Sequence, residues 1–169
     1  TIQEYIPDQN ILWLLNEVID SFHTKEQEKG LPLGNLTSQL FVNIYMNTFD
    51  QFVKHKLKTR YYVRYADDFA FFSQDRTQLE AYIPIIRIFL ANELRLSLHP
   101  DKVFIRTIAS GVDFLGWTHF LDHRVLRTTT KKRMMKKLKR DPNEASLQSY
   151  LGLLQHGDTY KLKRRVLND

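Results

Sequence analysis

Apolar residues at helical spacing dominate the first third of the chain. One set predicts a helix within residues 1–28, with Asp8 or Asn10 as its N-cap. A second set predicts a helix over about residues 37–57. Glycine and proline within residues 30–35 interrupt the pattern and predict a loop between the two helices.

Aromatic and β-branched residues then change the pattern to that of strands. Residues 60–64 and 69–72 are largely apolar and aromatic, and the carboxylates of Asp67 and Asp68 lie between them. Strand-forming residues on both sides of a short polar break are typical of a β-hairpin. The acidic pair is therefore predicted to lie at a hairpin turn.

Helix and strand signals alternate through the rest of the body. Asp75 and Gln78 have the spacing of a capping box at the start of another amphipathic helix. Alternating leucines predict a strand over 94–98, and further strand signals cover 103–106 and 111–117. These elements place the body in the α+β class.

The last third of the chain has a different character. Residues 131–140 interleave lysine and arginine with methionine and leucine, which predicts an amphipathic basic helix suited to following a phosphate backbone. Two more helices are predicted over 146–154 and 159–167. We expect a body of residues 1–120 and a basic domain of residues 121–169, made only of helices.

Charge is distributed unevenly along the 169 residues. Residues 1–117 carry 12 basic and 14 acidic side chains, whereas residues 118–169 carry 13 basic and 5 acidic ones. A near-neutral body with a basic end favours a polyanionic partner, although a solubilising face would give the same pattern. The absence of cysteine excludes disulfides and thiolate metal sites. We find no signal-peptide pattern and no membrane-spanning run, and expect a cytoplasmic protein without a membrane partner.

The adjacent carboxylates are the strongest candidates for chemistry. A turn lets a carboxylate project off the end of a sheet, and hard cations such as Mg²⁺ bind carboxylate oxygens. Two metal ions about 4 Å apart can activate a hydroxyl nucleophile and stabilise a leaving phosphate. Asp is common in turns, so the pair alone favours an ordinary polar turn, and the neighbouring motifs reverse that judgement.

Glycines supply two weaker signals. A glycine loop that opens a helix, as in residues 30–39, can bring backbone N–H groups up to a phosphate, although glycines before helices are more often only turns. Gly111 and Gly116 lie in a strand region, where the missing side chain allows a second backbone or a ligand to approach.

Four motifs, taken in order, resemble the palm and thumb of a reverse transcriptase. Residues 65–68 (Tyr-Ala-Asp-Asp) match the family's metal-binding hairpin, Tyr-x-Asp-Asp. Residues 33–39 (Leu-Gly-Asn-Leu-Thr-Ser-Gln) are similar to the loop and helix near the template and incoming nucleotide. Residues 99–102 (His-Pro-Asp-Lys) resemble the turn whose lysine lies near the triphosphate, and residues 114–117 (Phe-Leu-Gly-Trp) resemble the hairpin that grips the primer end. The resemblance covers nearly the whole chain and implies a right-hand polymerase palm, an antiparallel sheet with packed helices, followed by a small helical thumb.

The resemblance assigns roles to individual residues. It implies that Asp67 and Asp68 are catalytic and bind two Mg²⁺ ions, with Mn²⁺ as a substitute, and that Lys102 stabilises or protonates the leaving pyrophosphate. Lys102 as an exposed turn residue and Tyr65 as a core residue are the alternatives. The implied nucleotide and template residues are Gly34, Asn35, Ser38, Gln39 and Tyr65. The implied primer grip is Leu115, Gly116 and Trp117, and the implied contacts to the nucleic-acid backbone are Lys132, Arg133, Lys136, Lys137 and Lys139.

Gln39 refines the resemblance. Most bacterial enzymes of the group II intron type end the loop motif with Ser-Pro, whereas this chain has Ser38-Gln39. The variant is similar to the reverse transcriptases of diversity-generating retroelements, which copy an RNA template with errors at adenines. Gln39 would also be a plain helix residue, and a group II intron or retron enzyme remains the alternative. A non-catalytic nucleic-acid-binding scaffold derived from such an enzyme is a third interpretation.

Part of the family pattern has no match. The family's active site needs a third carboxylate on an earlier strand, but Asp8 and Asp20 fall in capping or helical contexts, and the fingers region also lacks a counterpart. We expect the C-terminal part of a catalytic core, inactive alone. The expected partners are an RNA template, a DNA or RNA primer, dNTPs, an upstream fingers and palm segment or second chain, and a small accessory protein or host factor.

Overall fold

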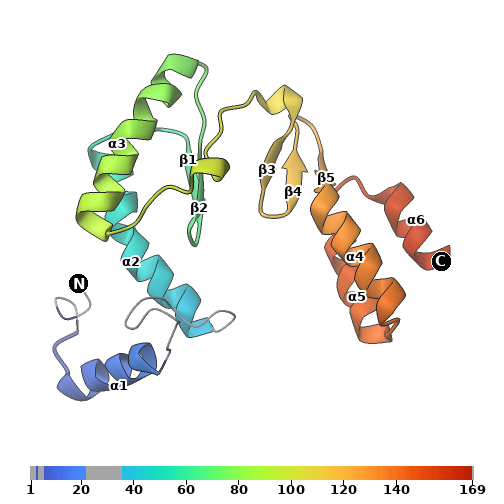
Figure 1. Cartoon of the computed structure of the whole chain (residues 1–169), viewed down its shortest axis with the longest axis horizontal. Helices are drawn as coiled ribbons and strands as arrows, with labels where there is room; N and C mark the ends of the chain where they lie inside the picture. Colours follow the sequence, from blue (N-terminus) through green and yellow to red (C-terminus); the bar gives the residue numbers. More distant parts are fainter. Residues whose placement is uncertain (1–2, 4–5, 22–35, 169) are drawn as a thin grey trace. The chain divides into compact units, whose positions relative to one another are not determined.

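The computed structural model describes residue 3 and residues 6–21 and 36–168, and divides the chain into two compact units, Thr1–Val103 and Phe104–Asp169. Helices and small antiparallel sheets occur together, which confirms the α+β class (Figure 1). The palm and thumb boundary after residue 120 stays a prediction. Within the described residues, no helix has the length and apolar character needed to cross a membrane.

The first unit begins with helix α1 (Gln9–Asp20), for which the predicted cap is correct: the Asp8 carboxylate accepts hydrogen bonds from the backbone of Asn10 and Ile11. The predicted helix extended to residue 28, but its part beyond residue 21 lies outside the described residues, as does the predicted loop over 30–35.

Two longer helices and a hairpin follow among the described residues of this unit. Two strands follow helix α2 (Leu36–His55) along the chain and precede helix α3 (Arg76–Leu94). They are β1 (Tyr62–Tyr65) and β2 (Asp68–Phe71). Phe49 and Val53 of α2 are fully buried, and they form the core with further apolar residues of α2 and α3 (Met46, Ile86, Leu90 and Leu94). Tyr62, Phe69 and Phe71 pack on this core from one face of the hairpin. The helices therefore cover one face of the two-stranded sheet, and burial of these aromatic rings fixes its orientation.

The second unit contains a three-stranded antiparallel sheet and three helices. The strands are β3 (Val112–Phe114), β4 (Trp117–His119) and β5 (Arg124–Leu126), with β4 in the middle. The helices are α4 (Thr128–Arg140), α5 (Glu144–Leu153) and α6 (Tyr160–Asn168). Their shared core consists of Trp117, Leu126, Met134, Leu154 and Val166. Strand β5 was not predicted, so the region beyond residue 120 is not composed of helices alone.

Two predicted strands are wrong. The alternating leucines at 94–98 do not form a strand, because Leu94 continues the i, i+4 series of Ile86 and Leu90 into the core and belongs to α3. Arg95 then ends the helix in the left-handed conformation, at φ 49°. Residues 103–106 have no strand partner among the described residues, and the predicted turn before them is a short 3-10 helix, Pro100–Lys102.

The predicted capping box at α3 is half correct. The Asp75 carboxylate accepts a hydrogen bond from the Thr77 backbone N–H at 2.8 Å. The reciprocal contact runs through Ser73, whose hydroxyl accepts from the Asp75 N–H at 3.0 Å and donates to Gln78 at 2.7 Å. A serine side chain therefore closes the network that Gln78 was expected to close directly.

Candidate active site

The acidic pair lies at the end of a tight hairpin. Strands β1 and β2 pair with Tyr65 opposite Asp68, so Ala66 and Asp67 alone form the turn. Ala66 has φ 52°, a left-handed conformation that costs a residue with a Cβ about 1 kcal/mol. Both carboxylates are exposed to solvent. We call β1, the Ala66–Asp67 turn and β2 the acidic hairpin.

The two faces of the acidic hairpin differ. Directly paired residues share a face, so Asp68 lies on the face of Tyr65, which also carries Tyr61, Val63 and Phe72. Tyr65 is 57% exposed and is not a core residue. This face is aromatic, open to solvent, and ends at the carboxylates.

The opposite face carries a polar network directly below the turn. Arg64 points inward from β1 and makes a two-pronged contact with the Asp50 carboxylate of α2, at 2.9 Å through Nε and 2.5 Å through Nη2. Its Nη1 donates to the Asn43 side-chain oxygen at 3.0 Å and to the Ala66 carbonyl at 2.8 Å. The Tyr62 hydroxyl donates to Asp50 at 2.8 Å. The network thus connects α2 with the peptide that precedes Asp67.

The charges of this network stabilise one another. Burial by itself would raise the pKa of Asp50, but the hydrogen bonds from Arg64 and Tyr62 outweigh it and hold the pKa below its ordinary value. The hydrogen bond to Asp50 raises the pKa of Arg64. Burial, followed by the bond to Asp50, raises the pKa of Tyr62 above its ordinary value. The network therefore holds a carboxylate, a guanidinium and a neutral phenol at neutral pH.

A second hairpin occurs in the other unit. Phe114 pairs with Trp117, and the turn consists of Leu115 at φ 50° and Gly116 at φ 83°. The Gly116 carbonyl accepts a hydrogen bond from the Arg127 backbone N–H at 3.0 Å. Two positive φ angles with glycine second are the geometry of a type I′ turn. We call β3, the Leu115–Gly116 turn and β4 the glycine hairpin.

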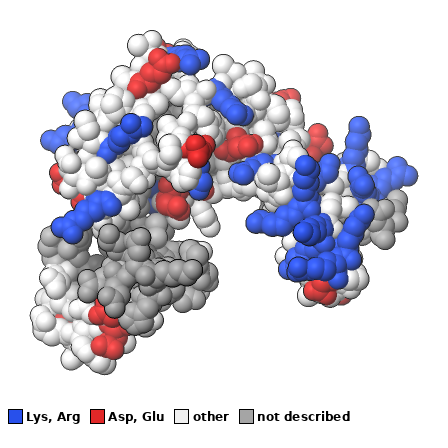
Figure 2. Space-filling view, in the orientation of Figure 1, with Lys and Arg blue, Asp and Glu red and all other residues white. Residues whose placement is uncertain are grey.

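Basic side chains gather next to the glycine hairpin, within the same unit. Helix α4 buries Met134 completely and exposes all five lysine and arginine residues predicted to contact nucleic acid: Lys132, Arg133, Lys136, Lys137 and Lys139. Figure 2 shows lysine and arginine side chains crowded over the second unit. A polar hollow beside the turn is lined by Gly116, Arg127, Thr129, Thr130 and Arg133. Only Gly116 and Arg133 of this set were predicted; the Arg-Thr-Thr-Thr run of residues 127–130, at the start of α4, was the signal for the rest.

Comparison with known proteins identifies the family. Residues 2–119 match the family model described as reverse transcriptase (RNA-dependent DNA polymerase). The chain belongs to the reverse transcriptase family. It is also 26% identical over 180 residues to Protein YkfC of Escherichia coli strain K12, a match that covers 85% of this chain. The match covers 46% of YkfC, so the chain spans about half the length of this curated relative.

The family match includes both hairpins and ends before β5. The acidic turn brings Tyr65, Asp67 and Asp68 together. Ser38 is buried and Gln39 is exposed in the first turns of α2, one turn or slightly more before Asn43, which contacts Arg64. The network below the acidic turn therefore links the turn to the helix that carries Ser38 and Gln39.

The remaining predicted residues are less closely connected. Lys102 ends the short 3-10 helix and is exposed. Between described residues, no hydrogen bond or ion pair joins Lys102 to the acidic pair. Trp117 is only 6% exposed and packs in the core, while Leu115 is exposed at the tip of its turn. Gly34 and Asn35 lie outside the described residues.

Reverse transcriptases generally use divalent metal ions, and the acidic turn is chemically suited to them. Asp67 and Asp68 offer adjacent, exposed carboxylates, the oxygen ligands that Mg²⁺ prefers. In the part of the chain that the structure describes, no group of three or more His, Asp or Glu side chains is arranged to hold a metal ion. Asp67 and Asp68 fit a divalent cation as two adjacent oxygen ligands.

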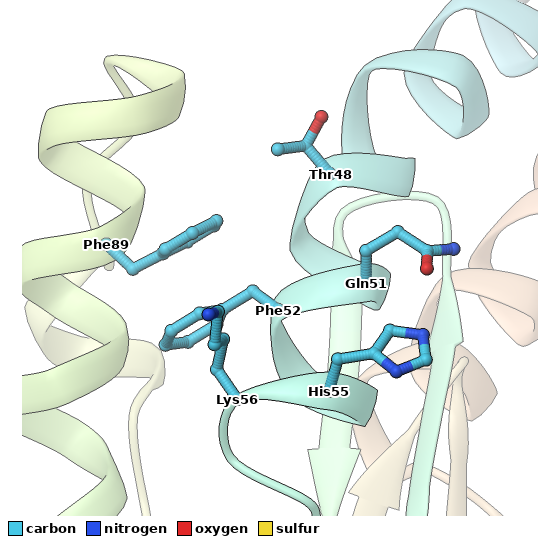
Figure 3. Close-up of a pocket in the computed structure, with 6 residues that line it drawn as sticks. All are labelled: Thr48, Gln51, Phe52, His55, Lys56 and Phe89. Atoms are coloured by element: carbon cyan, nitrogen blue, oxygen red, sulfur yellow. The ribbon is translucent and has the colours of Figure 1, made fainter.

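A second hollow, in the first unit, includes neither Asp67 nor Asp68. It is lined by Phe89 of α3 and by residues of α2 (Thr48, Gln51, Phe52, His55 and Lys56). Phe52 and Phe89 point toward each other and stack with ring centroids 3.9 Å apart (Figure 3). Asn43 and Asp50 are seven residues apart on α2 and share one face of the helix. The α2 residues of this hollow lie on a different side of the helix from that face. The hollow contains no predicted site residue.

Proposed function

We propose that this chain supplies the catalytic hairpin and the duplex-binding helices of an RNA-directed DNA polymerase from a retroelement. The Tyr-x-Asp-Asp turn carries the proposal, because its two adjacent carboxylates are exposed within the segment that matches the reverse transcriptase family. Exposed carboxylates are accessible to metal ions and to a triphosphate. A buried pair would be inaccessible.

The proposed reaction is attack of a primer 3′-hydroxyl on the α-phosphate of a dNTP, with pyrophosphate as the leaving group. Divalent ions, when bound, would activate the hydroxyl and neutralise charge on the phosphates. Asp67 and Asp68 would hold these ions. Lys102, exposed in the same unit, would donate a proton or a hydrogen bond to the pyrophosphate.

Other residues would position the nucleic acid. Gly34 and Asn35 with Ser38 and Gln39 would face the template and the incoming nucleotide, and Tyr65 would pack beneath the primer terminus. The exposed Leu115–Gly116 turn would contact the primer, while Trp117 would support this turn from the core. The basic face of α4 would bind the duplex backbone without reading its sequence. The hollow lined by Arg127 and Arg133 adds guanidinium groups for a phosphate next to the turn.

The site is proposed to be completed by another segment. The described residues group only two carboxylates at the turn, and the β1–β2 sheet leaves the face of Tyr61, Val63, Tyr65 and Phe72 open. A strand that carries a third carboxylate, from an upstream part of the protein or from a second chain, would supply the missing ligand. An accessory protein or host factor is a further proposed partner.

Gln39 supports the diversity-generating branch. Its side chain is exposed, so the core does not require this residue, which favours a contact with template or nucleotide. A group II intron or retron enzyme is the alternative within the family.

The test is primer extension on an RNA template with Mg²⁺. We would compare this chain alone, this chain together with the upstream segment of its protein, and the same pair carrying Asp67→Asn. We expect extension only from the unsubstituted pair. Asn keeps the shape of the side chain and removes its charge, so a loss of about a thousandfold or more would show that the carboxylate is needed for the reaction.

The outcomes separate the interpretations. Extension by this chain alone would contradict the proposed incompleteness. Extension that persists in Asp67→Asn would contradict the assigned metal site. Absence of extension with duplex binding intact would favour the non-catalytic scaffold.

A further inference from the structure

We propose that Arg64 is a positioning residue, which holds the peptide between Ala66 and Asp67 in the orientation that the metal-binding turn requires. This inference rests on the proposed function, because that function gives Asp67 its role. The observation behind it is the bond from Arg64 Nη1 to the Ala66 carbonyl, made by a guanidinium that is fixed from the other side by Asp50.

The guanidinium has little freedom. The Arg64 side chain is 10% exposed, and two parallel bonds to the Asp50 carboxylate orient its plane. Because the guanidinium is planar and rigid, that contact also determines where Nη1 points. The Asn43 oxygen accepts from the same nitrogen and restricts it further.

The acceptor is the peptide that controls Asp67. The Ala66 carbonyl and the Asp67 N–H belong to one planar unit, so fixing the carbonyl fixes the direction in which Asp67 leaves the turn. Ala66 also adopts a positive φ that its Cβ disfavours. Strained backbone of this kind persists only where surrounding contacts determine it, and Arg64 provides such a contact.

The network also sets the position of the turn relative to α2. Asn43 and Asp50 are seven residues apart on that helix, so both present side chains to the same face. A shift of α2 would therefore move the guanidinium and, through it, the Ala66 carbonyl. Arg64 connects the acidic turn to the helix that begins with the proposed nucleotide motif.

A purely structural role predicts something different. If Arg64 served only to neutralise Asp50, its replacement would destabilise the first unit without affecting the turn. Tyr62 provides the matched control, because its hydroxyl also donates to Asp50, whereas among the described side chains the hydrogen bond to the Ala66 carbonyl comes from Arg64. Tyr62→Phe keeps the aromatic ring in the core and removes only that hydroxyl.

The experiment uses the whole chain and measures two quantities by NMR: the backbone chemical shifts of Ala66 and Asp67 without metal, and the Mg²⁺ dissociation constant from the shifts of Asp67 and Asp68. The variants are Arg64→Lys, Tyr62→Phe and Asp67→Asn, with thermal unfolding measured for each. Lysine keeps the charge but cannot form the two-pronged contact. Asp50→Glu, which keeps the ion pair and displaces it by one methylene, is the second variant if Arg64→Lys fails to fold.

We expect Arg64→Lys to shift the Ala66 and Asp67 signals and to weaken Mg²⁺ binding about tenfold, the usual effect of losing a residue that orients a metal ligand. Asp50→Glu should act in the same direction. Tyr62→Phe should lower the unfolding temperature and leave the dissociation constant within about twofold of the unsubstituted chain. Asp67→Asn should abolish the site.

Two results would separate the role of Arg64 from the existence of the metal site. Unchanged Ala66 and Asp67 signals together with an unchanged dissociation constant in Arg64→Lys would overturn it and leave Arg64 as a structural residue. If the unsubstituted chain shows no Mg²⁺-dependent shift at Asp67 or Asp68, the two-ligand site fails. The metal-free signals then decide the role of Arg64: a change in Arg64→Lys but not in Tyr62→Phe supports it, and no change overturns it.

Discussion

The two hairpins share a turn length and differ in how the turn is held. Each has a two-residue turn whose first residue, Ala66 or Leu115, is not glycine and has a positive φ. In each, a carbonyl of the turn accepts a hydrogen bond from a residue outside the two-residue turn. In the glycine hairpin the donor is the backbone N–H of Arg127, whereas in the acidic hairpin it is the Arg64 side chain.

The difference follows from the second turn residue. Gly116 adopts its positive φ without strain, so local geometry is enough to define the glycine hairpin. Asp67 occupies the equivalent place in the acidic hairpin but does not have a positive φ, so the backbone of the two turns differs and Ala66 is the only left-handed residue of the acidic turn. The acidic turn is held by the Arg64 side chain of its own strand, which Asp50 and Asn43 of α2 orient.

The surroundings of the two hairpins also differ, because the glycine hairpin has more packing support than the acidic hairpin. The glycine hairpin is joined by β5, and its own Trp117 packs into the core with the Arg124 guanidinium 5.1 Å from the ring. Within the described residues, the acidic hairpin has no third strand and keeps an aromatic face open. The comparison predicts that packing changes will affect the glycine hairpin most, and that charge changes will affect the acidic hairpin.

The largest stability effect is expected from Gly157→Ala. A Cβ at this position would lie 2.8 Å from the Arg124 carbonyl and would collide with the Trp117 ring. Both are rigid parts of the sheet, so overpacking should destabilise the second unit by about 3 kcal/mol. Gly152→Ala is the control, since its Cβ meets nothing within 4 Å on a helix and should be neutral or slightly stabilising. Equal unfolding free energies for the two variants in urea would contradict this account of the packing.

Next in size is Asp50→Asn, which should destabilise the first unit by about 2 kcal/mol at pH 7 by leaving Arg64 without its anion. Because folding lowers the pKa of Asp50, the carboxylate contributes stability above the ordinary aspartate pKa, and that contribution is lost as the pH falls through the folded value. The difference between the two proteins should therefore shrink below about pH 4. Urea unfolding at several pH values measures it.

An exposed ion pair provides the comparison for this substitution. Glu80→Gln breaks the Arg76–Glu80 contact on the surface of α3, which should be worth well under about 1 kcal/mol. A destabilisation by Asp50→Asn no larger than that of Glu80→Gln, or one that stays constant down to pH 3, would contradict the importance of the network.

The sequence predicted the parts of the molecule whose signals are local. Strand formers around Asp67-Asp68, helical spacing in α2 and α4, and the glycines of the second hairpin each identify an element within a few residues. The strand predicted over 94–98 is wrong because Leu94 continues the helical spacing of α3 and packs in the core as its last residue. Strand β5 was missed because it has three residues and its stability comes from pairing with β4.

In the candidate site, too, only the residues with a local signal could be predicted from the sequence. The motif indicated Asp67 and Asp68, but no local pattern connects Arg64 with Asp50, which lies 14 residues earlier on a helix. An arginine within an aromatic strand carried the signal, because a charged residue on the inward face of a hairpin requires a buried partner. Which partner it would find, and that it would also reach the turn, depended on how α2 packs.

The smallest effects on stability should come from two substitutions, one in each turn: Gly116→Ala and Ala66→Gly. Gly116→Ala should destabilise the chain by about 1 kcal/mol, because φ 83° strains a residue with a Cβ although its surroundings leave room for one. Ala66→Gly should change stability by less than about 0.5 kcal/mol, since relief of strain is offset by greater freedom of the unfolded chain. Its effect should instead appear at the metal site: a turn without a Cβ is less restricted, so Mg²⁺ binding at Asp67 should weaken even though stability does not. Stronger Mg²⁺ binding in Ala66→Gly, measured by the same NMR titration, would mean that strain opposes the binding geometry and that Arg64 holds the turn in the wrong conformation for metal.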